Sequence, residues 1–430
     1  MNAYSTRGRA PAVSIADAIA AGLAPDGGLY MPATWPSFTA AQFEGADTLA
    51  DVATRFLAPF FTGGALESAL PRICGDAFAI EPPLADFGGP GDFLLELFHG
   101  PTAAFKDYGA AFLAGCLAAL PRGNKPLTIV VATSGDTGAA VAAAFDGRPG
   151  FRVAILYPDG RVSPRQAHQL GCFGDNISAF RVDGSFDDCQ RLAKTLLADA
   201  AYRAEVPLGS ANSISLGRLL PQAAYYAHTA LRHWRTTGRT LNFVVPTGNL
   251  GNALACLLAK RMGLPIGEVV LASNANTVLP DFFAGGDYAP RPSIATLANA
   301  MDVGAPSNFE RLQSLYPDNA ELRATLRAEA VSDAEIRAAI VRTRKERGHV
   351  VCPHTACAAD VLDRLRASGV AGDWAAVATA HPAKFPEVVE PLLGETIAPP
   401  PALAAMLART SHAQALANDA DLLKKRLQNA

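Results

Sequence analysis

Two glycines and two asparagines follow a strongly apolar run near the middle of the chain. Residues 247–252, TGNLGN, come directly after 241–246, LNFVVP, and precede a helical stretch over 253–263. Backbone N–H groups at the start of a helix bind phosphate, and glycine lets the ligand approach closely. The segment matches neither the nucleotide-hydrolase loop GxxxxGK[ST] nor the dinucleotide pattern GxGxxG. It predicts a cradle for one phosphomonoester, although packing alone can also place two glycines in such a turn.

Lys106 stands at the start of a long apolar segment. Residues 97–107, LFHGPTAAFKD, lead into 108–120, YGAAFLAGCLAAL. Pro101 is suited to a first helical position, which would put Lys106 in the first turns of an apolar helix. Desolvation and the helix dipole lower the pKa of such a lysine and favour an amine that forms an imine or shuttles a proton. The alternative is a snorkelling lysine paired with Asp107.

Two further segments combine hydroxyl, amide and charged groups. Residues 132–138, ATSGDTG, follow the apolar run 127–132 and open another helix, and these groups suit a carboxylate or a ring hydroxyl as ligand. Residues 211–218, ANSISLGR, combine an amide, two hydroxyls and a guanidinium, which can clamp a phosphate. Each segment alone could instead be an ordinary N-cap or a polar surface loop.

Four residues near the carboxyl end suggest a metal site by their types. His349, Cys352, His354 and Cys357 lie close together, but their spacing matches no common zinc pattern. We expect the two cysteines to pack at the start of a helix and predict no metal. The chain also contains no GxSxG segment, which argues against a Ser-His-Asp hydrolase of that type.

Short runs rich in β-branched residues alternate with helical patterns from residue 94 onward. Such alternation predicts parallel sheets covered on both faces, with ligands at the carboxyl ends of the strands. We predict two α/β lobes, over 94–235 and 236–430, with a cleft between them and a helical tail at the end. Residues 1–93 indicate a mainly helical region. The predicted strands are 127–132, 153–157, 241–245, 269–273 and 375–379.

The composition excludes several classes of protein. A chain of 430 residues that is 50% hydrophobic and 18% charged can form large cores and is poorly suited to disorder. The 37 Lys and Arg against 40 Asp and Glu leave a charge of −3 with no basic stripe, so we predict no nucleic-acid partner. The longest apolar stretches are shorter than the roughly 18 residues of a membrane span. We therefore predict an enzyme that acts on a small molecule.

The amino terminus and the cysteines predict the compartment. The first residues contain no signal-peptide core, and the seven cysteines form an odd, dispersed set. Both observations predict a cytoplasmic protein with free thiols.

Nine segments together resemble the threonine synthases, in the branch with a long amino-terminal region, within the fold type II family of pyridoxal-phosphate enzymes. The resemblance covers nearly the whole chain and keeps the family's order. It implies a two-lobed α/β fold similar to the tryptophan synthase β subunit, and pyridoxal 5'-phosphate as the cofactor. The segments are YSTRG at 4–8, PDGGLYMP at 25–32, FHGPTAAFKD at 98–107, ATSGDTGAA at 132–140, NSISLGR at 212–218, PTGNLGN at 246–252, MDVGAPSN at 301–308, PHTA at 353–356 and TAHPAKF at 379–385.

The resemblance also implies roles for single residues. Lys106 would form the Schiff base with the cofactor and act as the general base. Asp136 would face the ring hydroxyl of the cofactor, and Thr379 its pyridine nitrogen. The main-chain donors around the cofactor phosphate would be Gly248, Asn249, Leu250, Gly251 and Asn252. The residues that would hold the substrate's carboxylate and phosphate are Ser134, Thr137, Asn212, Ser213 and Arg218, with Lys384 and Arg7 as weaker candidates.

The implied reaction converts O-phospho-L-homoserine and water to L-threonine and phosphate, the last step of threonine biosynthesis. A phospholyase or a serine/threonine dehydratase with the same cofactor is the alternative, and Arg218 with Asn212 favours a phosphorylated substrate. One position departs from the family, because Cys352 stands where an acid is common. The acid is therefore not essential to the chemistry, or this protein differs in a local contact or effector response. We expect a monomer or a loose homodimer.

Overall fold

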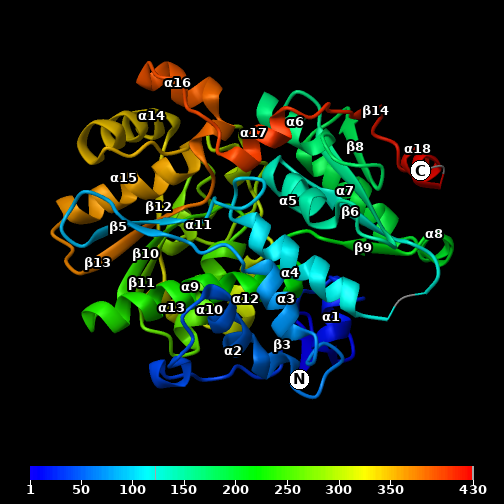
Figure 1. Ribbon diagram of the computed structural model, residues 1–430, viewed down its shortest axis with the longest axis horizontal. Coiled ribbons are helices and arrows are strands. Elements are labelled where there is room, and N and C mark those ends of the chain that lie inside the picture. Colours follow the sequence, from blue (N-terminus) through cyan, green and yellow to red (C-terminus); the bar gives the residue numbers. More distant parts are fainter. Residues whose placement is uncertain (122, 429–430) are drawn as a thin grey trace.

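The computed structural model describes residues 1–121 and 123–428, which are arranged as two α/β lobes above a small N-terminal unit (Figure 1). The larger sheet lies at the left of Figure 1 and the smaller at the right, and they approach each other at the middle of the molecule. Within the described ranges, no helix has both the length and the apolar character needed to cross a membrane.

The larger sheet has six strands in the order β12-β11-β10-β13-β5-β4, all parallel except β4. Alternate residues of β13 pack on opposite faces: Trp374 and Ala376 contact the core beneath α15, whereas Ala375 and Val377 contact the core beneath α9 and α10. Apolar residues on both faces are what a buried parallel strand requires. The strands are β4 Leu84–Asp86, β5 Asp92–Glu96, β10 Leu241–Pro246, β11 Ile266–Ser273, β12 Arg327–Ala330 and β13 Asp373–Ala378.

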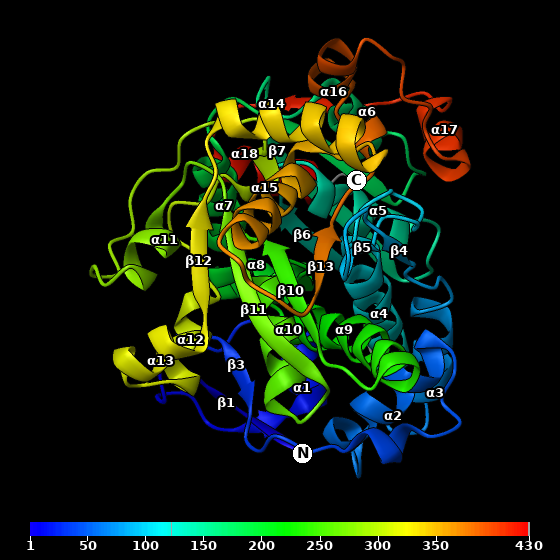
Figure 2. The same cartoon turned by 90° about the vertical axis from the view of Figure 1, so that its left-hand side faces the viewer.

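Helices cover both faces of this sheet, with α14 and α15 in front of it in Figure 2. The helical segments in this part of the chain are α9 Leu216–Thr237, α10 Gly251–Arg261, α11 Val278–Phe283, η2 Asn299–Met301, α12 Phe309–Leu315, α13 Asn319–Thr325, α14 Asp333–Arg342, the π-helical η3 Thr343–Arg347, α15 Pro353–Ala367, η4 Pro382–Lys384 and α16 Pro386–Leu393.

The smaller sheet has five parallel strands in the order β14-β8-β7-β6-β9. Val130 of β6 faces the core formed with α7, whereas Ile129 and Val131 face the core that contains α4 and α5. The strands are β6 Leu127–Ala132, β7 Phe151–Pro158, β8 Ile177–Val182, β9 Leu208–Ser210 and β14 Gln414–Leu416. The helices are α4 Lys106–Ala119, α5 Asp136–Phe145, α6 Pro164–Gly171, α7 Phe186–Ala198, α8 Ala200–Glu205, α17 Pro401–Leu407 and α18 Ala420–Gln428.

The N-terminal unit contains the expected helices and also a small antiparallel sheet in the order β2-β1-β3. The segment PDGGLYMP at 25–32 runs into β3, which pairs with β1 through Ser5 and Tyr30. The elements are β1 Asn2–Ser5, β2 Val13–Ser14, α1 Ile15–Ala21, β3 Tyr30–Pro32, η1 Ala40–Phe43, α2 Leu49–Phe61 and α3 Leu70–Ala77.

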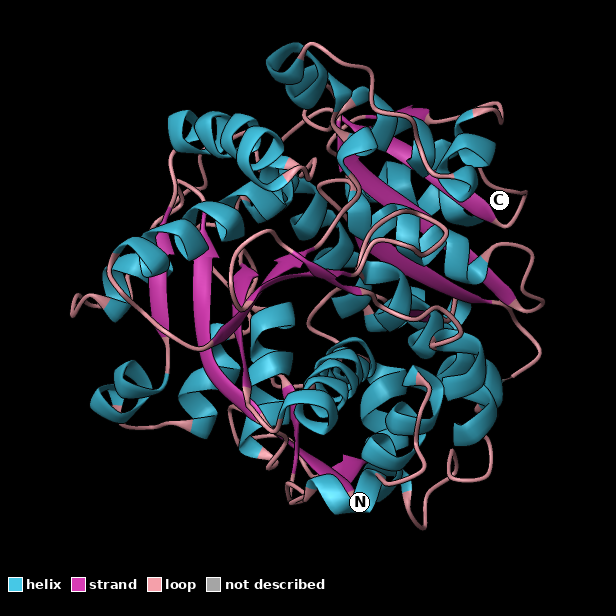
Figure 3. Cartoon of the chain, turned by 60° about the vertical axis from the view of Figure 1, so that its left-hand side comes forward, coloured by secondary structure: helices cyan, strands magenta, loops and turns pink. Residues whose placement is uncertain are grey.

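The sheets do not follow the lobe boundaries that we placed from the sequence. The boundary at residue 94 cuts β5, and β5 belongs to the larger sheet because it pairs with β13. In the same way, β14 lies in the tail but pairs with β8 of the smaller sheet. The chain therefore crosses between the sheets several times (Figure 3). The five predicted strands are all present, within a few residues of the expected ends.

Candidate active site

A loop that is hydrogen-bonded to the end of β13 positions Lys106. The N–H of Leu97 donates to Ala378 O at 3.0 Å and the N–H of Phe105 donates to Thr379 O at 2.9 Å. Ala103 has a positive φ of 55°, and its carbonyl accepts from the N–H of His381 at 3.0 Å. These bonds attach both ends of the loop to one strand exit, so the start of α4 is fixed to the larger sheet.

The turn before α4 is closed by Asp107 and not by a proline at the first helical position. The Thr102 N–H and hydroxyl donate to the two carboxylate oxygens of Asp107 at 2.9 and 2.6 Å. The helix begins at Lys106, so Pro101 lies in the preceding turn, which corrects our expectation. The carboxylate of Asp107 is occupied by Thr102, and Lys106 is therefore not a surface lysine paired with its neighbour.

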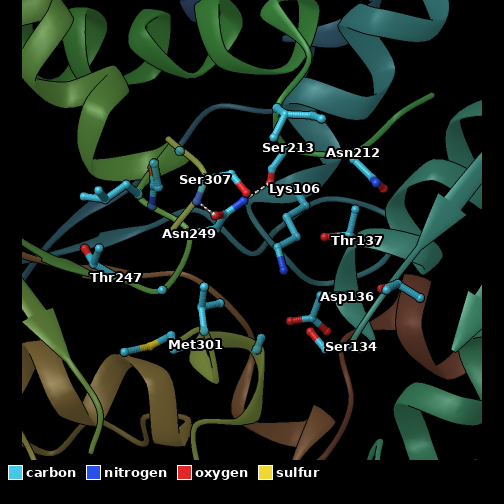
Figure 4. Close-up of a pocket in the computed structure, with 18 of the residues that line it drawn as sticks. Lys106, Ser134, Asp136, Thr137, Asn212, Ser213, Thr247, Asn249, Met301 and Ser307 are labelled. Carbon is cyan, nitrogen blue, oxygen red and sulfur yellow. Dashed lines mark hydrogen bonds between the residues drawn. The ribbon is translucent and has the colours of Figure 1, made fainter. Parts of the chain in front are cut away.

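The side chain of Lys106 extends into the pocket between the two sheets, toward Asp136 (Figure 4). Burial lowers the pKa of Lys106 to about 8, and the nearby carboxylate of Asp136 offsets part of that effect. In the described chain its amine has no hydrogen-bond or ion-pair partner, and it lies 5.7 Å from the centroid of the Phe105 ring. The site therefore contains an amine that is free to react and is partly neutral near physiological pH.

The cradle lies at the carboxyl end of β10, where the main chain of residues 248–252 lines the same pocket. Leu250 has a φ of 64°, and α10 begins at the next residue. Among the described atoms, the N–H groups of 248–252 donate to no protein acceptor. Five free donors at a helix N-terminus are suited to an anion such as a phosphate.

Neighbouring residues hydrogen-bond to Asn249 and Asn252, which are part of the cradle. Asn249 donates to Ser213 Oγ at 2.8 Å, and its own oxygens accept from the Ser307 N–H and from Asn308 Nδ2 (Figure 4). Asn252 Oδ1 accepts from the hydroxyl of Tyr226 at 3.0 Å, and also from that of Tyr225. The cradle is thus fixed before any ligand binds.

Asp136 is the charged group of the pocket that lies opposite the cradle. Its carboxylate accepts from Lys384 Nζ at 2.9 Å and from Gln166 Nε2 at 3.0 Å. Burial alone would raise the pKa of Asp136, but the charges of Lys384 and Lys106 outweigh it and hold the pKa well below its usual range. Asp136 is therefore an ionised carboxylate whose charge is balanced inside the protein.

The sequence-based assignment of Lys384 to the substrate anion is corrected by this pairing. Lys384 is fully buried at 0% exposure, bonds Asp136 and the Thr102 carbonyl, and is absent from the pocket wall. The other weak candidate, Arg7, lies on the surface and pairs with Glu310 at 3.2 Å. Neither side chain reaches the pocket.

Arg218 lines the pocket as a buried and incompletely bonded cation. It is 2% exposed, and one Nη donates to the Ala211 carbonyl at 2.7 Å. Arg218 Nε and Asn212 Oδ1 are buried without a partner in the described structure. Burial lowers the pKa of Arg218 to about 10, which leaves the guanidinium charged at neutral pH. The unpaired Nε donor of Arg218 marks a second place for an anion.

The other residues that we predicted for the site also line this pocket. Ser134 and Thr137 lie at the end of β6 and the start of α5, and Thr379 follows β13. The pocket also contains residues that the sequence did not single out for it: Phe186, Gln190, Lys194, Gln222, Met301 and His354. His354 accepts from the Ala300 N–H at 3.1 Å, and burial lowers its pKa to about 4, so its ring is neutral.

The His and Cys residues that suggested a metal bond mostly to groups outside this set, although Cys352 Sγ lies 3.8 Å from His354 Nδ1. Cys352 caps α15 by accepting from the Thr355 N–H, and Cys357 lies close to the Pro353 carbonyl. His349 contacts the main chain at Asp86. Residues 1–121 and 123–428 contain no group of three or more His, Cys, Asp or Glu that could hold a metal ion.

Comparison with known proteins shows which family has this site. The model of the family described as pyridoxal-phosphate dependent enzyme matches residues 86–382, and two models described as the threonine synthase N terminus and C-terminal region match 3–78 and 355–426. The threonine synthase of Escherichia coli is 40% identical over 407 residues, which is 94% of each chain. The chain belongs to the threonine synthase family of pyridoxal-phosphate-dependent enzymes.

Solved structures of threonine synthases agree with the fold described above. The pyridoxal-phosphate-bound threonine synthase from Brucella melitensis is 35% identical with a TM-score of 0.90, covering 100% of this chain and 99% of that one. The Escherichia coli threonine synthase is 37% identical with the same TM-score and covers both chains completely. The two-lobed fold and the cofactor class that we expected from the sequence are confirmed.

The pocket fits pyridoxal phosphate by its own chemistry. It combines five unpaired N–H groups for a phosphate, a desolvated amine for an aldehyde and an ionised carboxylate. A Cβ at Gly248 would lie 2.7 Å from the main-chain Cα of Met301, so only glycine leaves the cradle its present shape. The residues that would hold the cofactor are therefore Lys106, Asp136, Thr379 and the cradle.

Gly248→Ala should weaken cofactor binding by about 10-fold or more, because the new methyl group meets main chain that cannot move away easily. Titration of the apoprotein with pyridoxal phosphate, followed by absorbance, measures the effect. Gly75→Ala is the matched control, since that glycine is exposed in α3 and a Cβ there meets nothing within 4 Å. Unchanged affinity in Gly248→Ala would show that the cradle does not hold the cofactor.

Lys384→Met should lower the free energy of unfolding by about 3 kcal/mol, because it leaves the buried carboxylate of Asp136 without its cation. The double variant with Asp136→Asn should recover part of this loss. Urea unfolding of the apoprotein measures both, and Lys424→Met, which removes a partly exposed partner of Asp199, should have much less effect. Equal losses at the two lysines would contradict the buried pair.

Proposed function

We propose that this chain converts O-phospho-L-homoserine and water to L-threonine and phosphate, as a carbon–oxygen lyase acting on a phosphate ester. The observation that supports the proposal is the placement of two separate anion sites around one desolvated amine. The cradle of residues 248–252 accounts for the cofactor phosphate, and Arg218, whose Nε donor is unpaired, offers a second place for an anion. Only a phosphorylated substrate requires both.

Lys106 holds the cofactor and moves protons. When bound, pyridoxal phosphate supplies the electron sink for charge that develops on the substrate. With a pKa of about 8, a substantial fraction of the Lys106 amine is neutral near pH 7.5, so it can remove the α proton of the substrate and then a β proton. Phosphate then leaves Cγ, water adds at Cβ and the protons return.

The remaining groups of the pocket bind and orient. Arg218, Asn212 and Ser213 bind the substrate phosphate, and Ser134 and Thr137 bind its carboxylate. Asp136 would be the partner of the ring hydroxyl of the cofactor, and its charge stays fixed because Lys384 is bonded to it at 2.9 Å. Thr379 would offer a neutral hydroxyl to the ring nitrogen, which cannot hold that nitrogen protonated as a carboxylate would.

A phospholyase or a serine/threonine dehydratase would share the amine and the cradle. The buried guanidinium of Arg218 argues against a plain dehydratase, because its unpaired Nε would stay unsatisfied with an unphosphorylated substrate. A phospholyase differs from our proposal only in its products. A monomer or loose homodimer and a cytoplasmic location remain predictions from the sequence.

Incubation of the purified holoprotein with O-phospho-L-homoserine should release phosphate and L-threonine in equal amounts. Chromatography of the amino acids and a phosphate assay measure both products. Lys106→Arg should abolish turnover, because its guanidinium can neither carry the cofactor nor accept the α proton. Formation of 2-oxobutyrate without threonine would overturn the proposal in favour of a phospholyase.

A further inference from the structure

Helix α7 presents one of its faces to the pocket. Phe186, Gln190 and Lys194 are spaced four residues apart and all line the cavity. The opposite face, which includes Leu192 and Leu196, packs in the core of the smaller sheet. The capping box fixes where α7 begins, and the packing of its apolar face directs Lys194 toward the pocket.

Lys194 is a cation without a partner at the mouth of the pocket. Of the residues that line the pocket in the described chain, the exposed ones are Lys194, Ala305 and Ser307, so the rim has one charged side chain. Its neighbours one turn away on α7 are Gln190, Arg191, Leu197 and Ala198, none of which is acidic. Within the described ranges, no carboxylate lies within 4 Å of its ammonium.

The charges inside the pocket favour the approach of an anion to this rim. Asp136 is the acidic residue of the lining, and Lys384 already balances it. Arg218 adds a second positive charge, on α9, which packs with α10 beneath the larger sheet. Lys194 lies on α7, which packs against the smaller sheet, so the two cations approach the pocket from different lobes.

We propose that Lys194 binds the phosphate of the substrate together with Arg218. The inference rests on the proposed function, since it names a further contact for the same phosphorylated substrate. A dianionic phosphate inside the pocket can accept hydrogen bonds from the buried guanidinium on one side and from the ammonium at the rim on the other. The exposed ammonium also attracts the substrate before it enters, which makes binding dependent on ionic strength.

Lys194→Gln should raise the KM for O-phospho-L-homoserine about 10-fold with little change in kcat, because it removes a charge-assisted contact that is not part of the proton transfers. The dependence of kcat/KM on salt should become weaker. Lys194→Arg should restore most of the loss. Lys425→Gln, which removes an exposed lysine on α18, is the matched control and should behave as the parent protein.

Calorimetric binding of two analogues identifies the group that Lys194 contacts. Lys194→Gln should weaken 2-amino-5-phosphonopentanoate about 10-fold and leave L-2-aminopentanoate, which lacks the phosphonate, unchanged. Equal weakening of both would mean that Lys194 contacts the carboxylate and would overturn the assignment. Unchanged KM and affinity in Lys194→Gln, with threonine still formed by the parent protein, would reject the inference alone. Failure of the parent protein to form threonine would reject the proposed function.

Discussion

The site depends on one lysine amine that is largely desolvated and has no partner among the described residues. Desolvation lowers the pKa of Lys106 to about 8, and Asp136, the nearby carboxylate, is bonded to Lys384 instead. A direct ion pair with Asp136 would hold the amine protonated and unreactive. The loop that ends at Lys106 is hydrogen-bonded to the exit of β13, so the amine also has a fixed position relative to the larger sheet.

The two lobes contribute different parts of the site. The larger sheet carries the phosphate cradle at the end of β10 and Thr379 at the end of β13, whereas the smaller sheet carries Ser134 and Asp136. Gln166 joins these parts, because it donates to Asp136 and accepts from Asn299 near the larger sheet. An arrangement of this kind places ligands at the carboxyl ends of both sets of parallel strands.

Local patterns in the sequence predicted the parts of the site that are local in structure. The cradle is a strand, a turn and a helix start in consecutive residues. Arg218 is close in sequence to Asn212 and Ser213, with which we propose it binds the phosphate. The role of Lys384 was wrongly assigned to the substrate anion because its partner, Asp136, lies far away in the sequence. The lobe boundary at residue 94, which cuts β5, was misplaced for the same reason, since the partner of β5 is β13. The position of Lys194 at the pocket could not be predicted from the sequence, because an amphipathic pattern does not show what lies beside the exposed face of a helix.

Labelling of the apoprotein with pyridoxal phosphate and borohydride tests the central claim most directly. Only a neutral amine reacts, and the pKa of Lys106 is lowered from 10.5 to about 8, so its neutral fraction is large above that pH and falls below it. Peptide mapping should find the label on Lys106, with a labelling rate that rises with pH and reaches half its maximum near pH 8. Label spread over surface lysines, or a midpoint near their ordinary pKa, would contradict the account.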